Sequence, residues 1–294
     1  MKVPAYFRDT YAPAEVPLLS RLRNTAEKLQ RLGLVELREA EPLDAGSLAG
    51  LHDARYLKAF LEGDEPLASR QGIRWSPAVR DATLAMLGGQ LAAAETAMRE
   101  GIAMNVARGF HHAVHATGSG FCPINGLAML AHAMPERRIF VIDCDEHGGN
   151  GTEDFAARLD NLYNVSIFGT RFGCRGGLRS WAYQVRVQEE GFGQYLQALA
   201  AAESLLDLHR PDLLVYQAGA DCHEHDPKSL SRMTSHQLFL RDLNVFRMAR
   251  ERQLPVLFLV AGGYQDADRV ARLNANTVRA ARWVWRSFSL HGDT

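Results

Sequence analysis

The chain has 294 residues, of which 47% are hydrophobic and 23% are charged, and its formal net charge is −1. Such a balance is typical of an ordinary globular protein, and it excludes a strongly basic nucleic-acid coat protein and an acidic disordered chain. No apolar run approaches the ~20 residues that a membrane-spanning helix needs.

Short apolar runs alternate with helical patterns along the chain. In chain order, the sequence predicts a helix over 76–99, strands over 102–107, 139–142 and 165–168, a helix over 195–209, a strand over 213–216, a helix over 235–252, a strand over 256–261 and a helix over 267–288. The strand runs are apolar without alternation, which indicates that both faces are buried, as in a parallel sheet. Residues 170–194 are the least regular stretch and are expected to form a long surface loop.

This alternation of strands and helices predicts an α/β fold with a doubly wound, mostly parallel sheet flanked by helices. Proline and glycine are spread evenly along the chain, so no linker stands out. We therefore expect a single domain over residues 1–294.

Reactive side chains follow four of the predicted strands. After these strands come, in order, Arg108-Gly109-Phe110-His111-His112, Asp143-Cys144-Asp145-Glu146-His147, Gln217-Ala218-Gly219-Ala220-Asp221 and Gly262-Gly263-Tyr264. In an open parallel sheet, ligands bind outside the carboxyl ends of the strands. We therefore expect these side chains to converge on one rim, and this convergence is stronger evidence than any single motif.

Asp143, Asp145 and His147 are spaced by two residues, which places their side chains on one face of an extended chain. Asp145 and His147, with Asp221 from a distant strand, would offer two carboxylates and one imidazole and leave a position open. Such a set suits a catalytic Zn²⁺, and Fe²⁺ or Co²⁺ would also accept it. Spacing alone does not decide whether Asp143 is a ligand or supports one, because strand-end aspartates often cap the next helix.

Adjacent His111 and His112 point apart in an extended chain, so they are not expected to bind one ion together. Two imidazoles beside a metal are better candidates for proton transfer, and Asp143 and Asn150 are the available acceptors for their second ring nitrogens. Tyr264 follows two glycines that let the backbone turn sharply, and its hydroxyl would stabilise an oxyanion. The alternatives are a structural histidine pair and a tyrosine packed on the sheet edge.

Assembled in this order, the motifs resemble those of the histone deacetylase family, which has the arginase/deacetylase fold. The matching stretches are Gly109-Phe110-His111-His112-Ala113, Gly118-Ser119-Gly120-Phe121-Cys122, residues 141–152, Gln217-Ala218-Gly219-Ala220-Asp221 and Ala261-Gly262-Gly263-Tyr264, with a weaker match at 52–57. The similarity spans roughly residues 18–285, and class IV-like bacterial deacetylases are the branch that it resembles most.

The resemblance implies a role for each motif residue. The implied roles are Zn²⁺ ligands for Asp145, His147 and Asp221, general base and then acid for His112 paired with Asn150, electrostatic partner for His111 paired with Asp143, carbonyl binding for Tyr264, walls of an acyl-lysine tunnel for Gly120, Phe121 and Phe172, and a structural K⁺ near Asp143 and Ser166. The fold implied is a single arginase/deacetylase-like domain.

Several positions depart from the family pattern. Arg108 stands where the family usually has glycine, and we expect it to narrow the acyl foot of the pocket or close it by charge. Gly148 replaces a histidine or glutamine, and Phe168 replaces a histidine. The stretch before Ser76 has Arg70 and Arg74 but no acidic residue where several lysine deacetylases anchor the substrate backbone.

The leading hypothesis is a zinc-dependent amidohydrolase that removes an acetyl or other acyl group from an N-acyl-lysine-like amine. The same site acting on an acylpolyamine or another small-molecule amide is the second hypothesis. A binuclear manganese ureohydrolase would need a second strand-end aspartate pair, and Asp221 is followed by Cys222 and His223. A non-catalytic binding module predicts the loss of a ligand, a proton shuttle or the tyrosine, and none of these is missing.

The four cysteines, at 122, 144, 174 and 222, do not form a disulfide framework in a chain of this length. The start of the chain has no apolar segment of a signal peptide. We therefore expect a cytoplasmic protein without nucleic-acid or membrane partners, whose oligomeric state the sequence does not indicate.

Overall fold

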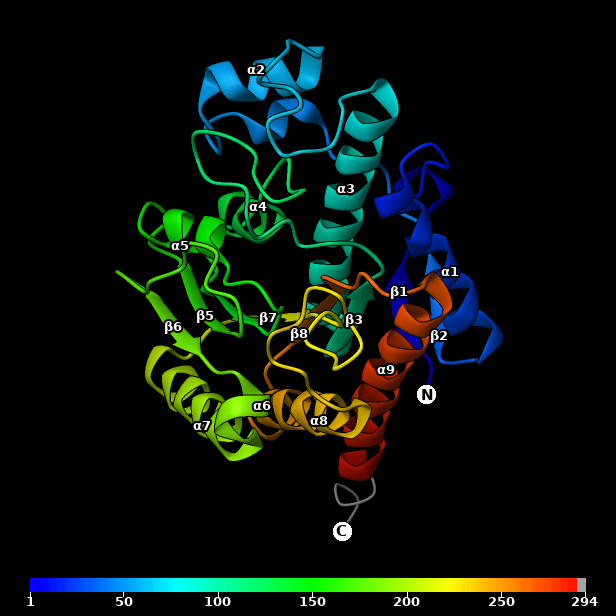
Figure 1. Cartoon of the computed structure of the whole chain (residues 1–294), viewed down its shortest axis with the longest axis vertical. Coiled ribbons are helices and arrows are strands. Elements are labelled where there is room, and N and C mark those ends of the chain that lie inside the picture. Colours follow the sequence, from blue (N-terminus) through cyan, green and yellow to red (C-terminus); the bar gives the residue numbers. More distant parts are fainter. Residues whose placement is uncertain (290–294) are drawn as a thin grey trace.

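A sheet of eight parallel strands crosses the protein in the computed structural model, which describes residues 1–289 and the side chains of residues 1–286 (Figure 1). Its strand order is β2-β1-β3-β8-β7-β4-β5-β6, and every pairing is parallel. The strands are β1 Val3–Tyr6, β2 Val35–Arg38, β3 Ile102–Asn105, β4 Ile139–Asp143, β5 Leu162–Phe168, β6 Ser180–Gln184, β7 Leu213–Ala218 and β8 Val256–Val260.

The five predicted strands form the middle of this sheet, as β3, β8, β7, β4 and β5. Every residue of β3, β4, β7 and β8 is buried. Continuous apolar runs are required there because helices cover both faces. The strands that were not predicted lie nearer the edges and lack such runs, since β1 contains Pro4, and β2 and β6 are only partly buried.

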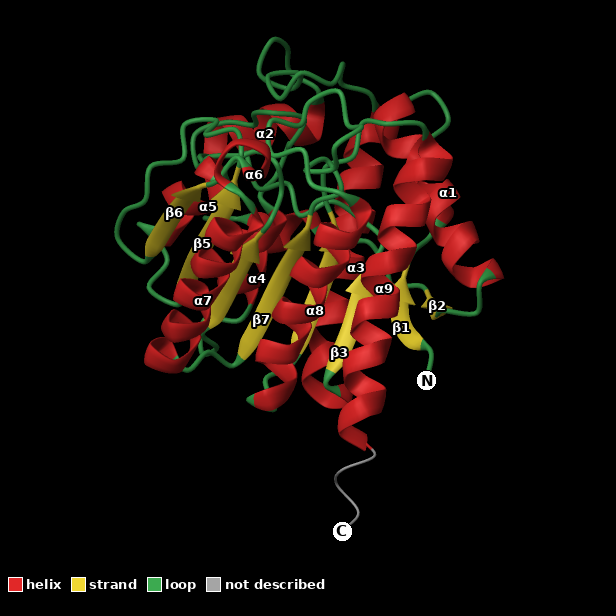
Figure 2. Cartoon of the chain, turned by 60° about the horizontal axis from the view of Figure 1, so that its bottom comes forward, coloured by secondary structure: helices red, strands yellow, loops and turns green. Residues whose placement is uncertain are grey.

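Helices lie on both faces of the sheet (Figure 2). One face carries α3 Pro77–Glu100, α4 Gly126–Ala133 and α5 Asn150–Ala156, and the other carries α1 Pro17–Arg31, α7 Phe192–His209, α8 Ser235–Glu251 and α9 Ala267–Ser289. Shorter elements are α2 Ala54–Glu62, α6 Val187–Glu190 and the 3₁₀ turns η1 Asp9–Tyr11 and η2 Ala45–Leu48. The predicted single α/β domain with a doubly wound parallel sheet is confirmed, and residues 290–294 of the predicted range lie outside the described residues.

Side-chain caps fix the N-termini of two of the predicted helices, α3 and α8. The Ser76 side chain accepts a hydrogen bond from the backbone N–H of Val79, Pro77 opens the first turn of α3, and Gly101 ends the helix at φ 85°. At α8, Thr234 and Gln237 form a reciprocal capping box. These caps satisfy backbone groups that a helix end leaves unpaired.

The stretch 170–194 is not a single surface loop, so that prediction is wrong. β6 pairs in parallel with β5 from Asn164↔Ser180 to Phe168↔Gln184, α6 follows it, and α7 begins at Phe192. β6 has a partner on one side only, and four of its five residues are partly exposed. A strand in that position does not need the continuous apolar run that marks a central strand.

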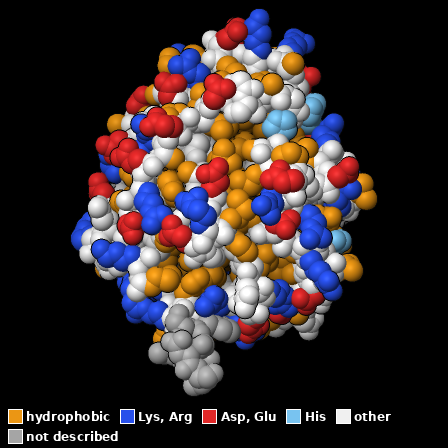
Figure 3. Space-filling view, turned by 180° about the vertical axis from the view of Figure 1, so that it is seen from behind, with side chains coloured by type: hydrophobic (Ala, Val, Ile, Leu, Met, Phe, Trp, Pro, Cys, Tyr) orange, Lys and Arg blue, Asp and Glu red, His pale blue; other side chains and the backbone are white. Residues whose placement is uncertain are grey.

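The connecting loops gather over the carboxyl ends of the strands (Figure 2). On the face seen from behind, positive and negative side chains are interspersed around apolar patches (Figure 3). In the part of the chain that the structure describes, no helix has both the length and the apolarity to cross a membrane. All four cysteines are buried and unpaired.

Candidate active site

Asp145, His147 and Asp221 meet at the carboxyl ends of two adjacent strands. β4 and β7 pair with Asp143 opposite Gln217, so the loops that follow them start side by side. The three side chains offer ligand atoms that all lie within 4.8 Å of one another. His147 Nδ1 lies 3.2 Å from Asp145 Oδ1 and 3.2 Å from Asp221 Oδ2. The sequence placed these residues on one rim, and the structure brings them together.

The charges in this triplet call for a cation. Both carboxylates are buried, and Asp221 Oδ2 makes no hydrogen bond of good geometry within the described residues, although His147 Nδ1 lies 3.2 Å away. Burial, and then the negative charge of Asp145, raises the pKa of Asp221 to about 7. Burial lowers the pKa of His147, but its contacts with the two carboxylates outweigh this effect and raise it to about 10. A buried set of two carboxylates and one imidazole fits a divalent cation such as Zn²⁺, Fe²⁺ or Co²⁺.

Asp143 stands outside the triplet. Its Oδ2 atom lies 2.6 Å from His111 Nδ1, and its Oδ1 atom accepts a hydrogen bond of 3.1 Å from the backbone N–H of Asp145. The carboxylate therefore orients a histidine and the ligand loop. Ser166 lies opposite Asp143 on the neighbouring strand β5, and its hydroxyl accepts the backbone N–H of Gly149.

The His111 and His112 rings lie side by side, with centroids 3.9 Å apart. The chain is not extended here, because it turns at these residues after Phe110, which has φ 58°, so the two rings do not point apart. His112 Nδ1 lies 2.8 Å from Asn150 Oδ1, so this nitrogen carries the proton. Its Nε2 atom is therefore left as an acceptor.

The two histidines differ in charge. Burial, and then the neighbouring His111, holds the pKa of His112 well below its usual value, so this ring is neutral near pH 7. Burial also lowers the pKa of His111, but the Asp143 and Asp145 carboxylates outweigh it and raise that pKa. A neutral imidazole can accept a proton, whereas a charged one beside it stabilises negative charge.

Tyr264 reaches the triplet over a glycine turn. A Cβ atom on Gly262 would lie 1.8 Å from Asp221 Oδ2, so only glycine fits there, and the Gly262 N–H donates a 2.6 Å hydrogen bond to Asp145 Oδ2. The Tyr264 ring lies edge-on to His147, with centroids 6.3 Å apart. Burial raises the pKa of its phenol above the ordinary value, so the hydroxyl keeps its proton and can donate it in a hydrogen bond.

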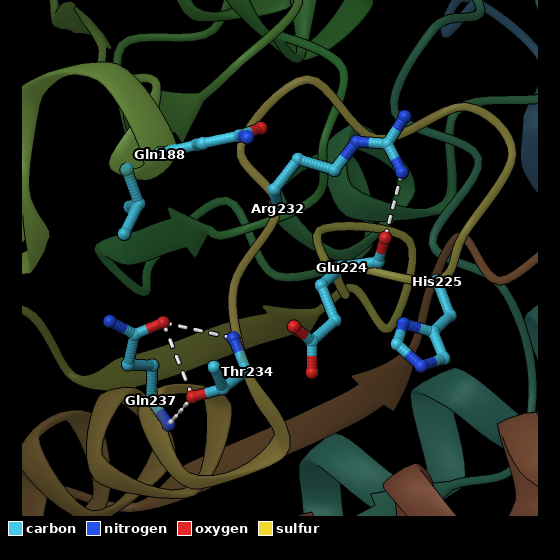
Figure 4. Close-up of a pocket in the computed structure, with 7 residues that line it drawn as sticks. Gln188, Glu224, His225, Arg232, Thr234 and Gln237 are labelled. Atoms are coloured by element: carbon cyan, nitrogen blue, oxygen red, sulfur yellow. Dashed lines mark hydrogen bonds between the residues drawn. The ribbon is translucent and has the colours of Figure 1, made fainter.

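The reactive groups surround a small chamber of about 20 Å³ whose lining includes Arg108, both histidines, Asp145 and Tyr264. A much larger hollow of about 540 Å³ lies between α6 and the start of α8 (Figure 4). Its lining includes Glu224 and His225 but no residue of the triplet or the histidine pair. The small chamber is therefore the candidate active site.

Aromatic rings stand at the outer side of this chamber. Phe172 stacks over His112 with centroids 4.0 Å apart, lies 6.0 Å from His147, and is 41% exposed. Gly120, at φ 52°, packs so closely on His112 that a Cβ atom would lie 2.5 Å from the ring, and Phe121 follows it. Of the three residues predicted as tunnel walls, Gly120 and Phe172 thus lie beside His112, and Phe121 lies near Lys228.

Two neighbours of Tyr264 were not predicted. The buried Asp226 accepts the Tyr264 backbone N–H at 2.7 Å, and Lys228 Nζ lies 5.0 Å from the Tyr264 ring centroid and 5.8 Å from that of Phe121. Both come from the irregular segment 222–234, which has no strand or helix periodicity. No spacing in the sequence indicates that this segment folds back over the tyrosine.

Comparisons with known proteins point to one family. The family model described as a histone deacetylase domain matches residues 17–281. An uncharacterized protein of Picosynechococcus sp. is 34% identical over 255 residues, which cover 82% of this chain and 83% of that protein. Histone deacetylase 2 of Arabidopsis thaliana is 32% identical over 203 residues, covering 65% of this chain and 51% of that protein.

Among solved structures, an acetylpolyamine aminohydrolase from Burkholderia pseudomallei superposes with a TM-score of 0.78. The superposition covers 96% of this chain and 99% of that one, at 21% sequence identity. At this level of identity the match shows the shared fold.

Proposed function

The chain belongs to the histone deacetylase family, and from this premise we propose that it is a metal-dependent deacylase that hydrolyses the amide of an acylated, lysine-like amine. The observation that carries the proposal is that Asp145 belongs both to the Asp145/His147/Asp221 triplet and to the wall of a chamber that the histidine pair and Tyr264 also line. Acyl transfer to water needs a polarised carbonyl, a base and an oxyanion donor, and these groups offer all three.

Asp145, His147 and Asp221 would hold the divalent cation, for which Zn²⁺ is the first candidate. When bound, such an ion supplies Lewis-acid polarisation of the amide carbonyl and of a water molecule. The oxygen and nitrogen ligands alone do not separate Zn²⁺ from Fe²⁺ or Co²⁺. A structural K⁺ beside Asp143 and Ser166 stays a proposal from the family resemblance.

His112 is the proposed general base, because it is neutral and its Nε2 atom is the nitrogen left without a proton by the Asn150 contact. It takes a proton from the attacking water and later returns it to the leaving amine. His111, held by Asp143, carries positive charge beside it and stabilises the negative charge that develops. Tyr264 donates its hydroxyl hydrogen to the oxyanion of the tetrahedral intermediate.

The acyl-polyamine alternative is supported by the fold of the Burkholderia aminohydrolase. Lys228 opposes it, because its ammonium group lies over the Tyr264 and Phe121 rings and would repel a cationic amine there. A cationic amine would favour acidic groups at the mouth of the site, but the Glu65 carboxylate already accepts hydrogen bonds from the Ser69 backbone N–H, at 3.2 Å, and from the Ser69 hydroxyl. We therefore favour substrates in which the groups around the acylated amine are neutral or anionic over acylated polyamines, which carry further positive charges.

A metal and substrate assay tests the proposal. The chain should bind one equivalent of divalent metal, lose activity on chelation, and hydrolyse an acetyl-lysine peptide faster than an acetylpolyamine. His112→Ala should lose more activity than His111→Ala while both keep the metal. No hydrolysis of any acyl amine by metal-loaded protein would contradict the proposal, and two equivalents of Mn²⁺ would favour a ureohydrolase.

A further inference from the structure

We propose that Arg108 is a specificity-determining residue that closes the inner end of the chamber and restricts the acyl group to formyl or acetyl. The inference rests on the proposed deacylase function and names the acyl class of that same site. It is carried by the placement of the Arg108 side chain and by the size of the space beside it.

Arg108 occupies the interior side of the chamber. It follows β3 at the centre of the sheet and is only 7% exposed, whereas Phe172 on the opposite, outer side is 41% exposed. Its guanidinium carbon lies 5.7 Å from the centroid of the Tyr264 ring. An amide whose carbonyl meets Tyr264 and whose amine leaves past Phe172 therefore points its acyl group toward Arg108.

The space in the chamber is very small. The whole chamber has a cavity volume of about 20 Å³, which is room for roughly one water molecule. A formyl hydrogen or an acetyl methyl therefore displaces the walls least. Each further methylene would have to displace wall atoms, because Gly262, Gln217 and Cys122 close the remaining sides.

The charge at this end also disfavours a longer alkyl chain. No ion pair found within the described residues includes Arg108, so this buried guanidinium is not neutralised by a protein carboxylate. Gln217, which lines the same chamber, has a buried Oε1 atom without a hydrogen-bond donor. Alkyl groups placed here would exclude water from the charge of Arg108, whose side chain is hydrogen-bonded to the Tyr264 hydroxyl, and from the unpartnered Gln217 Oε1 atom.

The same feature gives the hydrolysis product a place. Water attack on the amide breaks the C–N bond, places an oxygen on the acyl carbon and releases a carboxylate and an amine. The carboxylate forms beside Arg108. The anionic formate or acetate product is therefore attracted by the guanidinium more strongly than the neutral amide substrate is. Acetate is therefore expected to compete with the substrate more strongly than butyrate, which does not fit.

The test compares acyl groups on one amine. Formyl-, acetyl-, propionyl-, butyryl- and succinyl-lysine peptides of the same sequence are assayed with metal-loaded wild-type protein and with Arg108→Ala. For the wild type, kcat/KM should fall by about 10–200-fold from acetyl to propionyl, the range that one mismatched methylene group produces in a closed pocket, and it should fall further to butyryl, which has two more methylene groups than acetyl. Arg108→Ala should reduce the acetyl-to-butyryl ratio at least about tenfold, and butyrate should then inhibit as acetate does.

Lys228→Ala is the matched control, because Lys228 is also a cation over the Tyr264 ring but lies on the exposed side. It should leave the acetyl-to-butyryl ratio unchanged. Arg108→Gln, which is shorter but polar, replaces Arg108→Ala if the latter loses its metal or its cooperative thermal unfolding.

Three results would overturn the inference: wild-type activity that is equal across acyl lengths, a preference for succinyl, or a ratio that neither Arg108 variant changes. Each leaves the proposed deacylase function intact. Absence of activity on every acyl group contradicts the proposed function instead, so the two failures are distinguishable.

Discussion

Two buried charged clusters lie next to each other behind the carboxyl ends of β4 and β7, and they differ in how their charges are satisfied. In the first, Arg241 pairs with Asp242 at 2.9 Å, and Asp242 also accepts hydrogen bonds from Tyr216 and Thr277. In the second, the triplet around Asp221, two carboxylates share one imidazole and one oxygen makes no hydrogen bond of good geometry. The charges of the first, complete cluster are satisfied by protein groups, whereas those of the second, incomplete cluster are not, which is why we propose that a cation binds there.

The complete cluster also supports the incomplete one. Arg241 Nη1 donates to the carbonyl of Cys144 at 3.0 Å and to the carbonyl of Gly219 at 2.8 Å. Cys144 precedes the ligand Asp145, and Gly219 lies two residues before the ligand Asp221. A buried arginine thus joins the two ligand loops, so stability and metal binding should be separable by substitution but not independent.

The largest expected effect is on the incomplete cluster. Asp221→Ala removes one of two carboxylate ligands, so metal content should fall to background and activity by at least ~10³-fold. Elemental analysis and kcat/KM on an acetyl-lysine peptide measure both. Asp143→Ala is the control, because Asp143 contacts His111 rather than the triplet, and it should keep part of the metal. Equal metal loss in both variants would place Asp143 among the ligands.

The complete cluster is broken by Arg241→Met. The substitution leaves Asp242 as a buried charge without its cation, and it should lower the free energy of unfolding by about 3–5 kcal/mol. Urea unfolding of the metal-free protein measures this. Adding Asp242→Asn removes the unpaired charge while keeping an acceptor for Tyr216, and should restore part of the stability. A single variant as stable as wild type would show that the pair is not important.

Tyr264→Phe separates chemistry from folding beside the incomplete cluster. The ring stays, so metal content and melting temperature should hardly change. Loss of one oxyanion donor should lower kcat about 10²–10³-fold, or roughly 3–4 kcal/mol in the barrier. A near-wild-type kcat would remove the hydroxyl from the mechanism and leave Tyr264 as a packed aromatic.

The smallest expected effect concerns a third buried polar group, His52, whose two ring nitrogens are both hydrogen-bonded only when the imidazole is neutral. His52 Nδ1 donates to the carbonyl of Val114 at 3.0 Å, and its Nε2 atom accepts the backbone N–H of Asn125 at 3.1 Å. Burial lowers its pKa to about 4, against an ordinary value of about 6.5. Below pH ~6.5 the His52 imidazole is therefore protonated in the unfolded chain, whereas in the folded chain it stays neutral down to about pH 4.

This residue should contribute stability that is present above pH ~6.5 and lost as the pH falls toward 4, by at most about 3 kcal/mol. The difference in unfolding free energy between wild type and His52→Gln, measured between pH 7.5 and 4.5, isolates this contribution from other titrating groups. The difference should shrink on acidification. A difference that does not change with pH would mean that folding does not lower the pKa of His52.

How regular a segment's sequence pattern is explains what could be predicted from the sequence. The central strands were found because their apolar runs are continuous, and the predicted site residues follow those strands directly. Strands β1, β2 and β6 were missed because Pro4 or partly exposed residues interrupt their pattern. Asp226 and Lys228 were missed because the segment that carries them has no periodicity, and its path over Tyr264 is set only by tertiary contacts.

Because β4 pairs with β7, a metal bound by the proposed triplet would report on the assembly of the sheet. Asp145 and His147 belong to one loop, but Asp221 comes 76 residues later, and only the parallel β4–β7 register joins them. Such non-local parallel pairings form slowly, because the intervening chain must be ordered before they stabilise anything. A nascent or refolding chain therefore offers two weak ligands at first and the complete set only after the centre of the sheet has closed. The rate of tight metal uptake should thus equal the rate of that long-range closure.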